Sequence, residues 1–163
     1  MKSVRITDIT VHRRHLPHWE LPGAVYFVTF TLRNRNICDL TSAGIAPIIL
    51  DALSFYVNRR YFLHDHTIMP NHVHVILEPI VDGGKAEKLG DIVGDLKRYT
   101  ARKINGILGR SGPFWLDESF DRIIRDKKEY EEKARYIFEN PVAKGLVETG
   151  EDWRWWRPGI PPP

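Results

Sequence analysis

Two histidines separated by one residue, His72 and His74, are the sharpest chemical feature of this 163-residue sequence. Side chains at positions i and i+2 of a β-strand point to the same face, about 7 Å apart along the strand. Two imidazoles placed in this way can chelate one divalent metal ion. The same spacing also fits two unrelated polar side chains on a solvated sheet face, so spacing alone leaves both interpretations open.

A second pair of histidines, His64 and His66, precedes the first pair in the chain. If residues 70–71 form a tight turn between two strands, both lie on the side of the sheet opposite to His74. A shift of one residue would instead bring all four histidines together in a site typical of zinc. The first register is favoured, and a zinc hydrolase remains an alternative.

Tyr99 is the second chemical feature, because it lies in a predicted basic helix. Winding at about 100° per residue puts Tyr99 at the margin of the apolar stripe, where a phenol can contact both the domain and solvent. Such a helix suits a phosphodiester backbone, although it is also typical of a solvated helix surface. Residues 97–110 contain no acidic residue and five basic ones, which are Lys97, Arg98, Arg102, Lys103 and Arg110.

A metal-binding pair and an outward tyrosine on a basic helix together suit phosphodiester transesterification. The ion would polarise a non-bridging phosphate oxygen while the Tyr99 phenol attacks the phosphorus, giving a phosphotyrosine and a free 3′-hydroxyl. Neighbouring cationic side chains would neutralise the charge that develops. The expected chemistry is that of a nuclease or strand transferase.

Strand and helix signals alternate along the chain and predict an α+β domain: a ferredoxin-like antiparallel sheet with helices packed on it. The predicted elements are a strand at 24–32, a helix capped by Thr41 or Ser42, a hairpin of strands 61–69 and 72–78, a helix at 87–108, a strand at 120–125 and a helix at 127–139 that Asn140 and Pro141 end. We expect one domain over residues 1–157, with an N-terminal arm, and a flexible tail at 158–163.

The composition, 42% hydrophobic and 28% charged, excludes membrane, collagen and low-complexity classes. A net charge of +3 favours acidic partners only weakly. The single cysteine, Cys38, cannot form an internal disulfide, and the first residues lack the apolar stretch of a signal peptide. We expect a cytoplasmic protein without membrane contact.

In its motifs the sequence resembles the REP-associated tyrosine transposases, which are part of the single-tyrosine HUH transposase superfamily. The resemblance extends over most of the chain, in the expected order. It rests on Arg13–Trp19 with Tyr26–Phe30, Met69–His74, Leu96–Ala101, Phe114–Trp115, Phe120–Arg125 and Tyr136–Val147.

The resemblance implies a fold of the HUH nuclease type. It further implies that His72 and His74 hold Mg²⁺ or Mn²⁺ and that Tyr99 is the nucleophile. The expected substrate is single-stranded DNA beside a short palindromic hairpin, cut through a 5′-phosphotyrosine intermediate. The wider superfamily supplies a third polar metal ligand, often one turn after the nucleophile. That position is Lys103 here, which cannot ligate while protonated.

The third ligand therefore stays open between Asp95 and Asn105, and metal dependence could be weak. A domesticated protein that binds hairpins without cutting them is the main alternative. Either form is expected to act as a monomer or a homodimer. The predicted DNA-binding residues are Arg13 and Arg14 in an N-terminal arm that also carries His12 and His15, and Lys97, Arg98, Arg102 and Lys103 on the basic helix.

Overall fold

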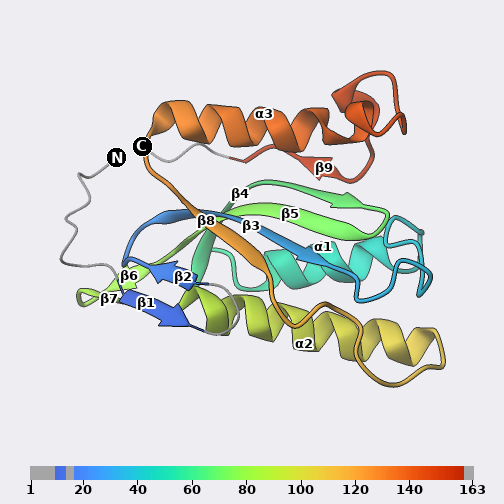
Figure 1. The fold of residues 1–163 in the computed structure, drawn as a ribbon, viewed down its shortest axis with the longest axis horizontal. Coiled ribbons are helices and arrows are strands. Elements are labelled where there is room, and N and C mark those ends of the chain that lie inside the picture. The colour runs from blue at the N-terminus through green and yellow to red at the C-terminus, as the bar shows by residue number, and fades with distance from the viewer. Residues whose placement is uncertain (1–9, 14–16, 160–163) are drawn as a thin grey trace.

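The computed structural model describes residues 10–13 and 17–159 and places an antiparallel sheet between two layers of helices (Figure 1). In the part that the model describes, no helix is both long and apolar enough to span a bilayer. The elements are β1 (Thr10–Arg13), β2 (Pro17–Glu20), β3 (Val25–Thr31), α1 (Ala46–Phe55), β4 (Tyr61–Met69), β5 (His72–Pro79), β6 (Val81–Asp82), β7 (Lys85–Ala86), α2 (Leu89–Ile107), β8 (Phe120–Ile124), α3 (Lys127–Ala143), a 3-10 helix (Gly150–Asp152) and β9 (Trp156–Arg157).

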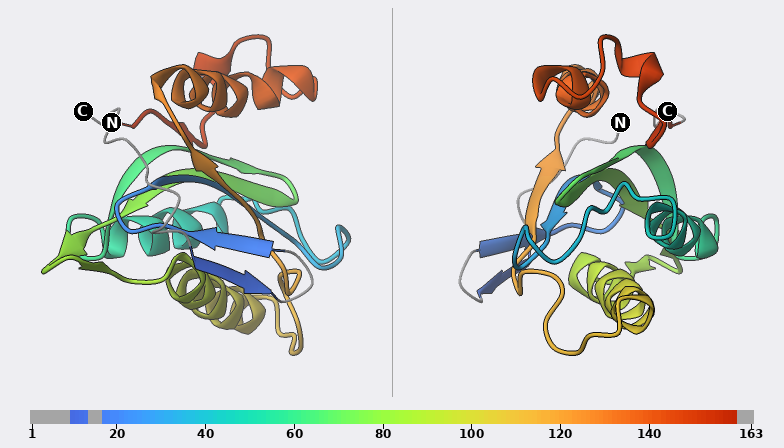
Figure 2. Two further views of the ribbon diagram at one scale, coloured as in Figure 1. Left: turned by 60° about the vertical axis from the view of Figure 1, so that its left-hand side comes forward. Right: turned by 90° about the vertical axis from the view of Figure 1, so that its right-hand side faces the viewer.

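The main sheet has the strand order β8-β3-β5-β4-β9, and every neighbouring pair is antiparallel. Without β9, this is the order of a ferredoxin-like βαββαβ unit, in which α1 joins β3 to β4 and α2 joins β5 to β8. Both of these helices cover one face of the sheet, and α3 covers the other (Figures 1 and 2). The predicted ferredoxin-like fold is confirmed.

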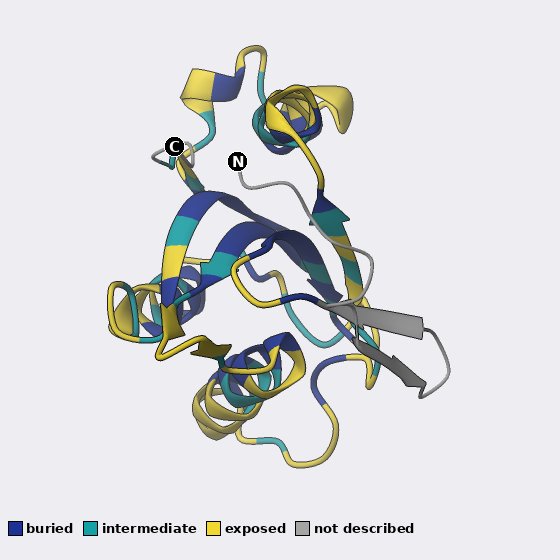
Figure 3. Ribbon diagram, turned by 90° about the vertical axis from the view of Figure 1, so that its left-hand side faces the viewer, coloured by how far each residue is buried: buried dark blue, intermediate teal, exposed yellow. Residues whose placement is uncertain are grey.

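Alternating residues of the strands pack into two separate cores, one on each face of the sheet. The larger core lies between the sheet and the α1 and α2 helices, and it includes Val73, Val75 and Leu77 of β5, as predicted. The smaller core lies under α3 and includes Phe27 and Ile76. Buried positions follow the sheet and the inner sides of the helices in Figure 3. His72 and His74 alternate with the larger core and therefore face α3.

The hairpin of β4 and β5 has the predicted two-residue turn, and Met69 pairs with His72. A β-bulge between Leu63 and His66 then shifts the register. His66 pairs with Val75, on the face away from His74, as expected.

His64 was expected on that face too, which is wrong. Its ring packs edge-on against Tyr130 of α3 at 5.8 Å, and its Nε2 lies 3.5 Å from Glu78 Oε2. The bulge is the cause, because one extra residue reverses the side to which the preceding side chain points. Across the described residues, no three His, Cys, Asp or Glu side chains are grouped to hold one metal ion, so the four histidines do not form the zinc-like site.

Two predicted helix boundaries are wrong. The first residue of α1 follows Ile45, and neither Thr41 nor Ser42 caps it through a side chain; the Ser42 carbonyl instead accepts from the Ile45 and Ala46 N–H groups. The final helix does not stop at Asn140. The short β6–β7 hairpin was not predicted, and residues 160–163 of the expected tail lie outside the described residues.

The α3 helix continues through Pro141, because a proline in the last turn removes only one backbone hydrogen bond. The helix ends in a Schellman motif: the Gly145 N–H donates to the Val142 carbonyl and the Leu146 N–H to the Pro141 carbonyl, each at 2.9 Å. Gly145 has a φ of 69°, which glycine adopts without a steric penalty. This ending keeps Asn140 inside the helix.

We expect Gly145→Ala to lower the free energy of unfolding by about 1–2 kcal/mol, because a Cβ is strained at this positive φ. Gly106→Ala is the matched control. It lies inside α2 with open space around the added Cβ, and it should stabilise the protein by about 0.5–1 kcal/mol. Urea unfolding of both variants measures the difference, and equal effects of the two would contradict the motif.

Candidate metal and nucleophile site on the α3 face

The two histidine side chains converge on one point. His72 Nε2 and His74 Nε2 lie 3.1 Å apart. His72 Nδ1 lies 2.7 Å from Asn71 Oδ1, an oxygen that can only accept, so Nδ1 carries the proton and Nε2 the lone pair. His74 Nδ1 lies 2.6 Å from Thr29 Oγ1, which can accept or donate. Both rings are thus held at Nδ1 with their Nε2 atoms facing each other. When the Thr29 hydroxyl accepts from His74 Nδ1, both Nε2 atoms carry lone pairs, the usual arrangement around a metal ion.

Both histidines are neutral at physiological pH. Burial lowers the pKa of His72 to about 4, with a further contribution from the cationic side chains of Lys144 and Arg35. Burial and the neighbouring His72 lower the pKa of His74 to about 3. Neutral imidazole is the form that binds metal, so the pair is ready to ligate without first losing a proton.

The structure does not bring Tyr99 to these histidines within one chain. Tyr99 lies on α2, on the opposite face of the sheet, with 42% of its surface exposed. It lines a cleft with Phe55, the last residue of α1, and the following Tyr56, whereas His72 and His74 line a separate cavity. The basic helix with Tyr99 therefore forms a different surface from the one that carries the histidine pair.

Tyr136 of α3 is the tyrosine that meets the histidine pair. Its ring centroid lies 5.3 Å from that of His74, and Phe27 contacts both rings. About half of the Tyr136 surface, 48%, stays exposed, so the phenol is accessible from solvent while its ring is packed. Tyr136 begins the family motif Tyr136–Val147, but no role was predicted for it.

Asn140 lies one turn after Tyr136, on the same side of α3. Tyr136 packs on His74, and Lys144, two turns later, lines the cavity beside His72. Positions i, i+4 and i+8 share one side of a helix, so Asn140 lies between these contacts. Asn140 is buried, and its Oδ1 has no hydrogen-bond partner within the described part of the chain. A buried acceptor without a partner is costly unless a ligand satisfies it.

These donors fit a divalent ion. Two imidazole nitrogens 3.1 Å apart match neighbouring ligands of one ion, which at about 2.1 Å from the metal lie about 3 Å from each other. Asn140 Oδ1 supplies an unused oxygen nearby. Imidazole prefers ions softer than Mg²⁺ and amide oxygen prefers hard ones, so the mixed set favours Mn²⁺ over Mg²⁺. Asp95 and Asn105, the residues that the sequence offered as third ligand, lie on α2, as does Lys103.

The cavity beside the histidines has a volume of about 670 Å³ and is open to solvent. Arg35 and Lys144 line it, and their charges act on His72. Sequence reasoning missed both residues, because they lie far from the histidines in the chain. Two cations beside a metal-binding pair suit an anionic phosphate.

The predicted DNA-binding residues on α2 lie away from this cavity. On α2, Lys97 uses its ammonium group to hold the following loop, through the carbonyls of Leu116 and Asp117 at 2.7 and 2.9 Å and Ser119 Oγ at 3.2 Å. Arg98 pairs with Asp95, Arg102 lines the α1–α2 cleft, and the Lys103 ammonium lies 5.8 Å from the centre of the Tyr99 ring. Arg14 and the side chain of Arg13 lie outside the described residues.

No family model matches the chain. A protein of Haemophilus influenzae named "Putative REP-associated tyrosine transposase" is 26% identical over 141 residues, which cover 80% of this chain and 77% of that protein. A REP-associated tyrosine transposase of Escherichia coli is 25% identical over 135 residues, covering 82% and 75%.

A solved structure of a REP-associated tyrosine transposase bound to a REP hairpin aligns with a TM-score of 0.71 at 20% identity, covering 89% of this chain and 80% of that chain. In sequence and in fold, the chain is similar to REP-associated tyrosine transposases. The resemblance found in its motifs is thereby confirmed, and the fold is that of the transposase structure.

Proposed function

We propose that this protein is a metal-dependent single-strand DNA endonuclease and strand transferase that acts beside a palindromic hairpin, with Tyr136 as its nucleophile. The contact between Tyr136 and His74 carries the proposal, because it puts an accessible phenol next to two convergent imidazoles. The names of the two relatives and the hairpin bound in the aligned structure support the substrate class.

The residues of this chain have separate roles in the proposed reaction. Lys144 and Arg35 bind the phosphate and orient it in the cavity. Tyr136 Oη attacks the phosphorus; the bond from phosphorus to the 3′-oxygen breaks as the new bond forms. The phenol proton passes to water, and the released 3′-oxygen takes a proton from water. Strand transfer is the reverse reaction, in which a 3′-hydroxyl attacks the phosphotyrosine.

His72, His74 and Asn140 would hold the divalent ion. When bound, the ion acts as a Lewis acid that polarises a non-bridging phosphate oxygen. Asn71 and Thr29 hold the two rings with Nε2 toward the cavity.

Asn140 gives a direct test of the third ligand. We expect Asn140→Ala to weaken Mn²⁺ binding about 10-fold or more, because an oxygen donor is lost. Asn140→Asp, which keeps an oxygen at this position, should retain binding. Calorimetric titration of the metal-free protein measures both affinities, and thermal unfolding shows that each variant is folded. Equal Mn²⁺ affinity in wild type and Asn140→Ala would remove Asn140 from the ligand set.

The position of Asn140 also bears on the alternative of a non-catalytic hairpin binder. That alternative depended on Lys103, which cannot ligate, as the residue one turn after Tyr99. With Tyr136 as the nucleophile, the corresponding residue is an asparagine with an unpaired oxygen. The reason for expecting a disabled metal site therefore no longer applies.

The proposal is tested by incubating the protein with a panel of hairpin oligonucleotides that carry single-stranded flanks, with Mn²⁺, Mg²⁺ or EDTA. We expect metal-dependent cleavage at one position of a flank and a protein–DNA adduct that survives denaturing electrophoresis. Binding of hairpins without cleavage or adduct under any metal would favour the non-catalytic binder.

A further inference from the structure

We propose that Phe120 is a stacking platform for an unpaired DNA base next to the cleaved phosphate. This inference deepens the proposed function and rests on it, because it names a subsite for the same single-stranded substrate. Phe120 has no role in either core, and 53% of its surface is exposed.

The sheet aligns Phe120 with the metal pair. Phe120 pairs with Thr29 on β3, and Thr29 pairs with His74 on β5, so the three residues form one row across the sheet. Directly paired residues point to the same face, and two strand spacings separate Phe120 from His74 by about 10 Å. β8 is the edge strand of this sheet, so no further strand of the sheet lies beyond Phe120, although β2 contacts β8.

Aromatic rings connect Phe120 to the nucleophile. The Phe120 ring packs on Phe27 at 6.2 Å, and Phe27 packs on Tyr136 at 6.0 Å and on His74 at 5.4 Å. Phe27 is buried and fixes the inner edge of the Phe120 ring, so the ring is held in place while part of its surface faces solvent. A fixed, exposed aromatic ring at a nucleic-acid site suits the face of a base.

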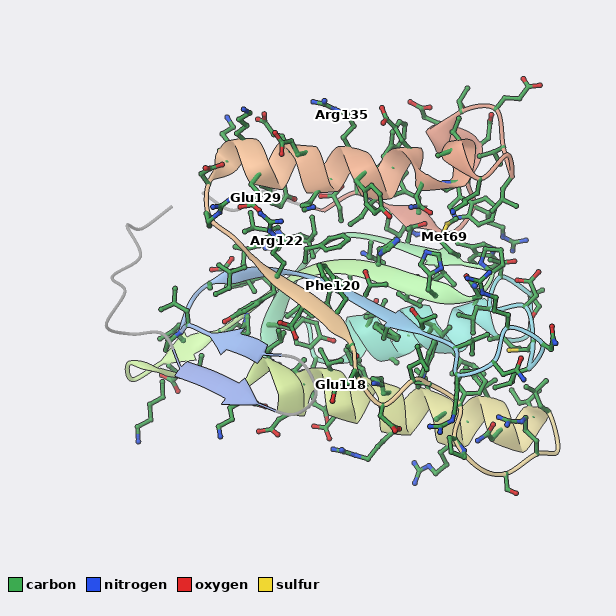
Figure 4. The ribbon with its side chains drawn as sticks, viewed as in Figure 1. Met69, Glu118, Phe120, Arg122, Glu129 and Arg135 are labelled. Carbon is green, nitrogen blue, oxygen red and sulfur yellow. The ribbon has the colours of Figure 1, made fainter. Side chains whose placement is uncertain are left out.

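Positive charge surrounds these rings. The Lys133 ammonium lies 5.3 Å from the Phe27 ring, and Arg122 is half-exposed along β8 from Phe120, as Figure 4 shows. Glu129, at the start of α3, is paired with both Arg122 and Arg125, so these three side chains together keep one net positive charge. An apolar ring bordered by cations complements a nucleotide, because the ring can stack on the base and the cations can pair with the phosphate. A purely apolar protein partner would form no ion pair with these cations.

The test replaces Phe120 and the base separately. Phe120→Ala should weaken binding of the single-stranded flank about 10- to 100-fold, because a base–aromatic stack is lost. Phe120→Trp keeps a stacking ring and should retain affinity. Phe62→Ala is the matched control: Phe62 is an exposed phenylalanine on β4 of the same sheet, with 43% of its surface exposed, and its loss should leave affinity unchanged.

A series of flanks, each with one abasic site beside the cleavage position, locates the base. One abasic site should weaken wild-type binding as much as Phe120→Ala does, and it should have no further effect on the variant. The platform would be contradicted if, at every position, the losses of affinity caused by the abasic site and by Phe120→Ala added up. It would also be contradicted if Phe120→Ala bound the intact flank with wild-type affinity. Thermal unfolding shows that each variant is folded.

Two readouts separate this inference from the proposed function. Affinity reports on the platform, and the covalent adduct reports on the nucleophile. If wild type forms the adduct and Phe120→Ala binds normally, the platform fails and the function stands. If wild type forms no adduct but the abasic effect depends on Phe120, the protein is a single-strand binder and the catalytic proposal fails.

Discussion

Replacing Tyr136 by phenylalanine is expected to abolish the covalent protein–DNA adduct and to slow strand cleavage by at least about 10³-fold. The change removes only the oxygen that would attack the phosphorus, while the ring contacts with His74 and Phe27 remain. Hairpin affinity should therefore stay the same. An oligonucleotide labelled on the 3′ side of the cleavage position reports the adduct as labelled protein on a denaturing gel.

Tyr99→Phe is the matched control, because it removes the hydroxyl of the tyrosine that the sequence favoured. On α2, behind the sheet, Tyr99 has no contact with the histidines of its own chain. Its variant should form the adduct at the wild-type rate. The opposite pattern, an adduct with Tyr136→Phe and none with Tyr99→Phe, would mean that Tyr99 reaches the histidines of a second subunit in a homodimer.

The comparison of the two tyrosines shows what sequence reasoning could predict here. Hydrophobic periodicity located the sheet and its helices, and the hairpin turn put His72 and His74 on one face. The predicted meeting of Tyr99 and the histidines does not occur within one chain, for a physical reason: the charge around Tyr99 is informative about its helix, but not about the side of the sheet on which that helix packs. Only tertiary packing brings α3, and not α2, over the histidines.

A second signal was present in the sequence but was interpreted as a helix end. Asn140 followed by Pro141 usually stops a helix, because proline lacks an N–H group and clashes with the preceding turn. Here the Schellman motif and packing of Ile137 against the sheet hold the last turn together. On a continuous helix, a tyrosine followed four residues later by an asparagine would have suggested both the nucleophile and the third ligand that are proposed above. Arg35 and Lys144 gave no such signal.

Replacing either histidine of the pair by alanine is expected to remove metal-stimulated cleavage, with a loss of at least about 100-fold. His72 and His74 contribute the two nitrogens that converge at 3.1 Å, so neither can substitute for the other. Cleavage by wild type should fall to the same level in EDTA and return with added Mn²⁺, whereas the variants should not recover at that concentration. Cleavage rates across a Mn²⁺ titration measure the effect.

His64→Gln is the control for this experiment, because it changes a buried histidine of β4 that contacts Glu78 and Tyr130 and not the pair. It should keep metal-stimulated cleavage, since the β-bulge separates His64 from the convergent nitrogens. Loss of metal stimulation in His64→Gln with a normal unfolding transition would bring back a site built from several histidines. Cleavage by the His72 and His74 variants that is insensitive to EDTA would show that Tyr136 attacks without a metal, with Lys144 and Arg35 as the remaining charges at the phosphate.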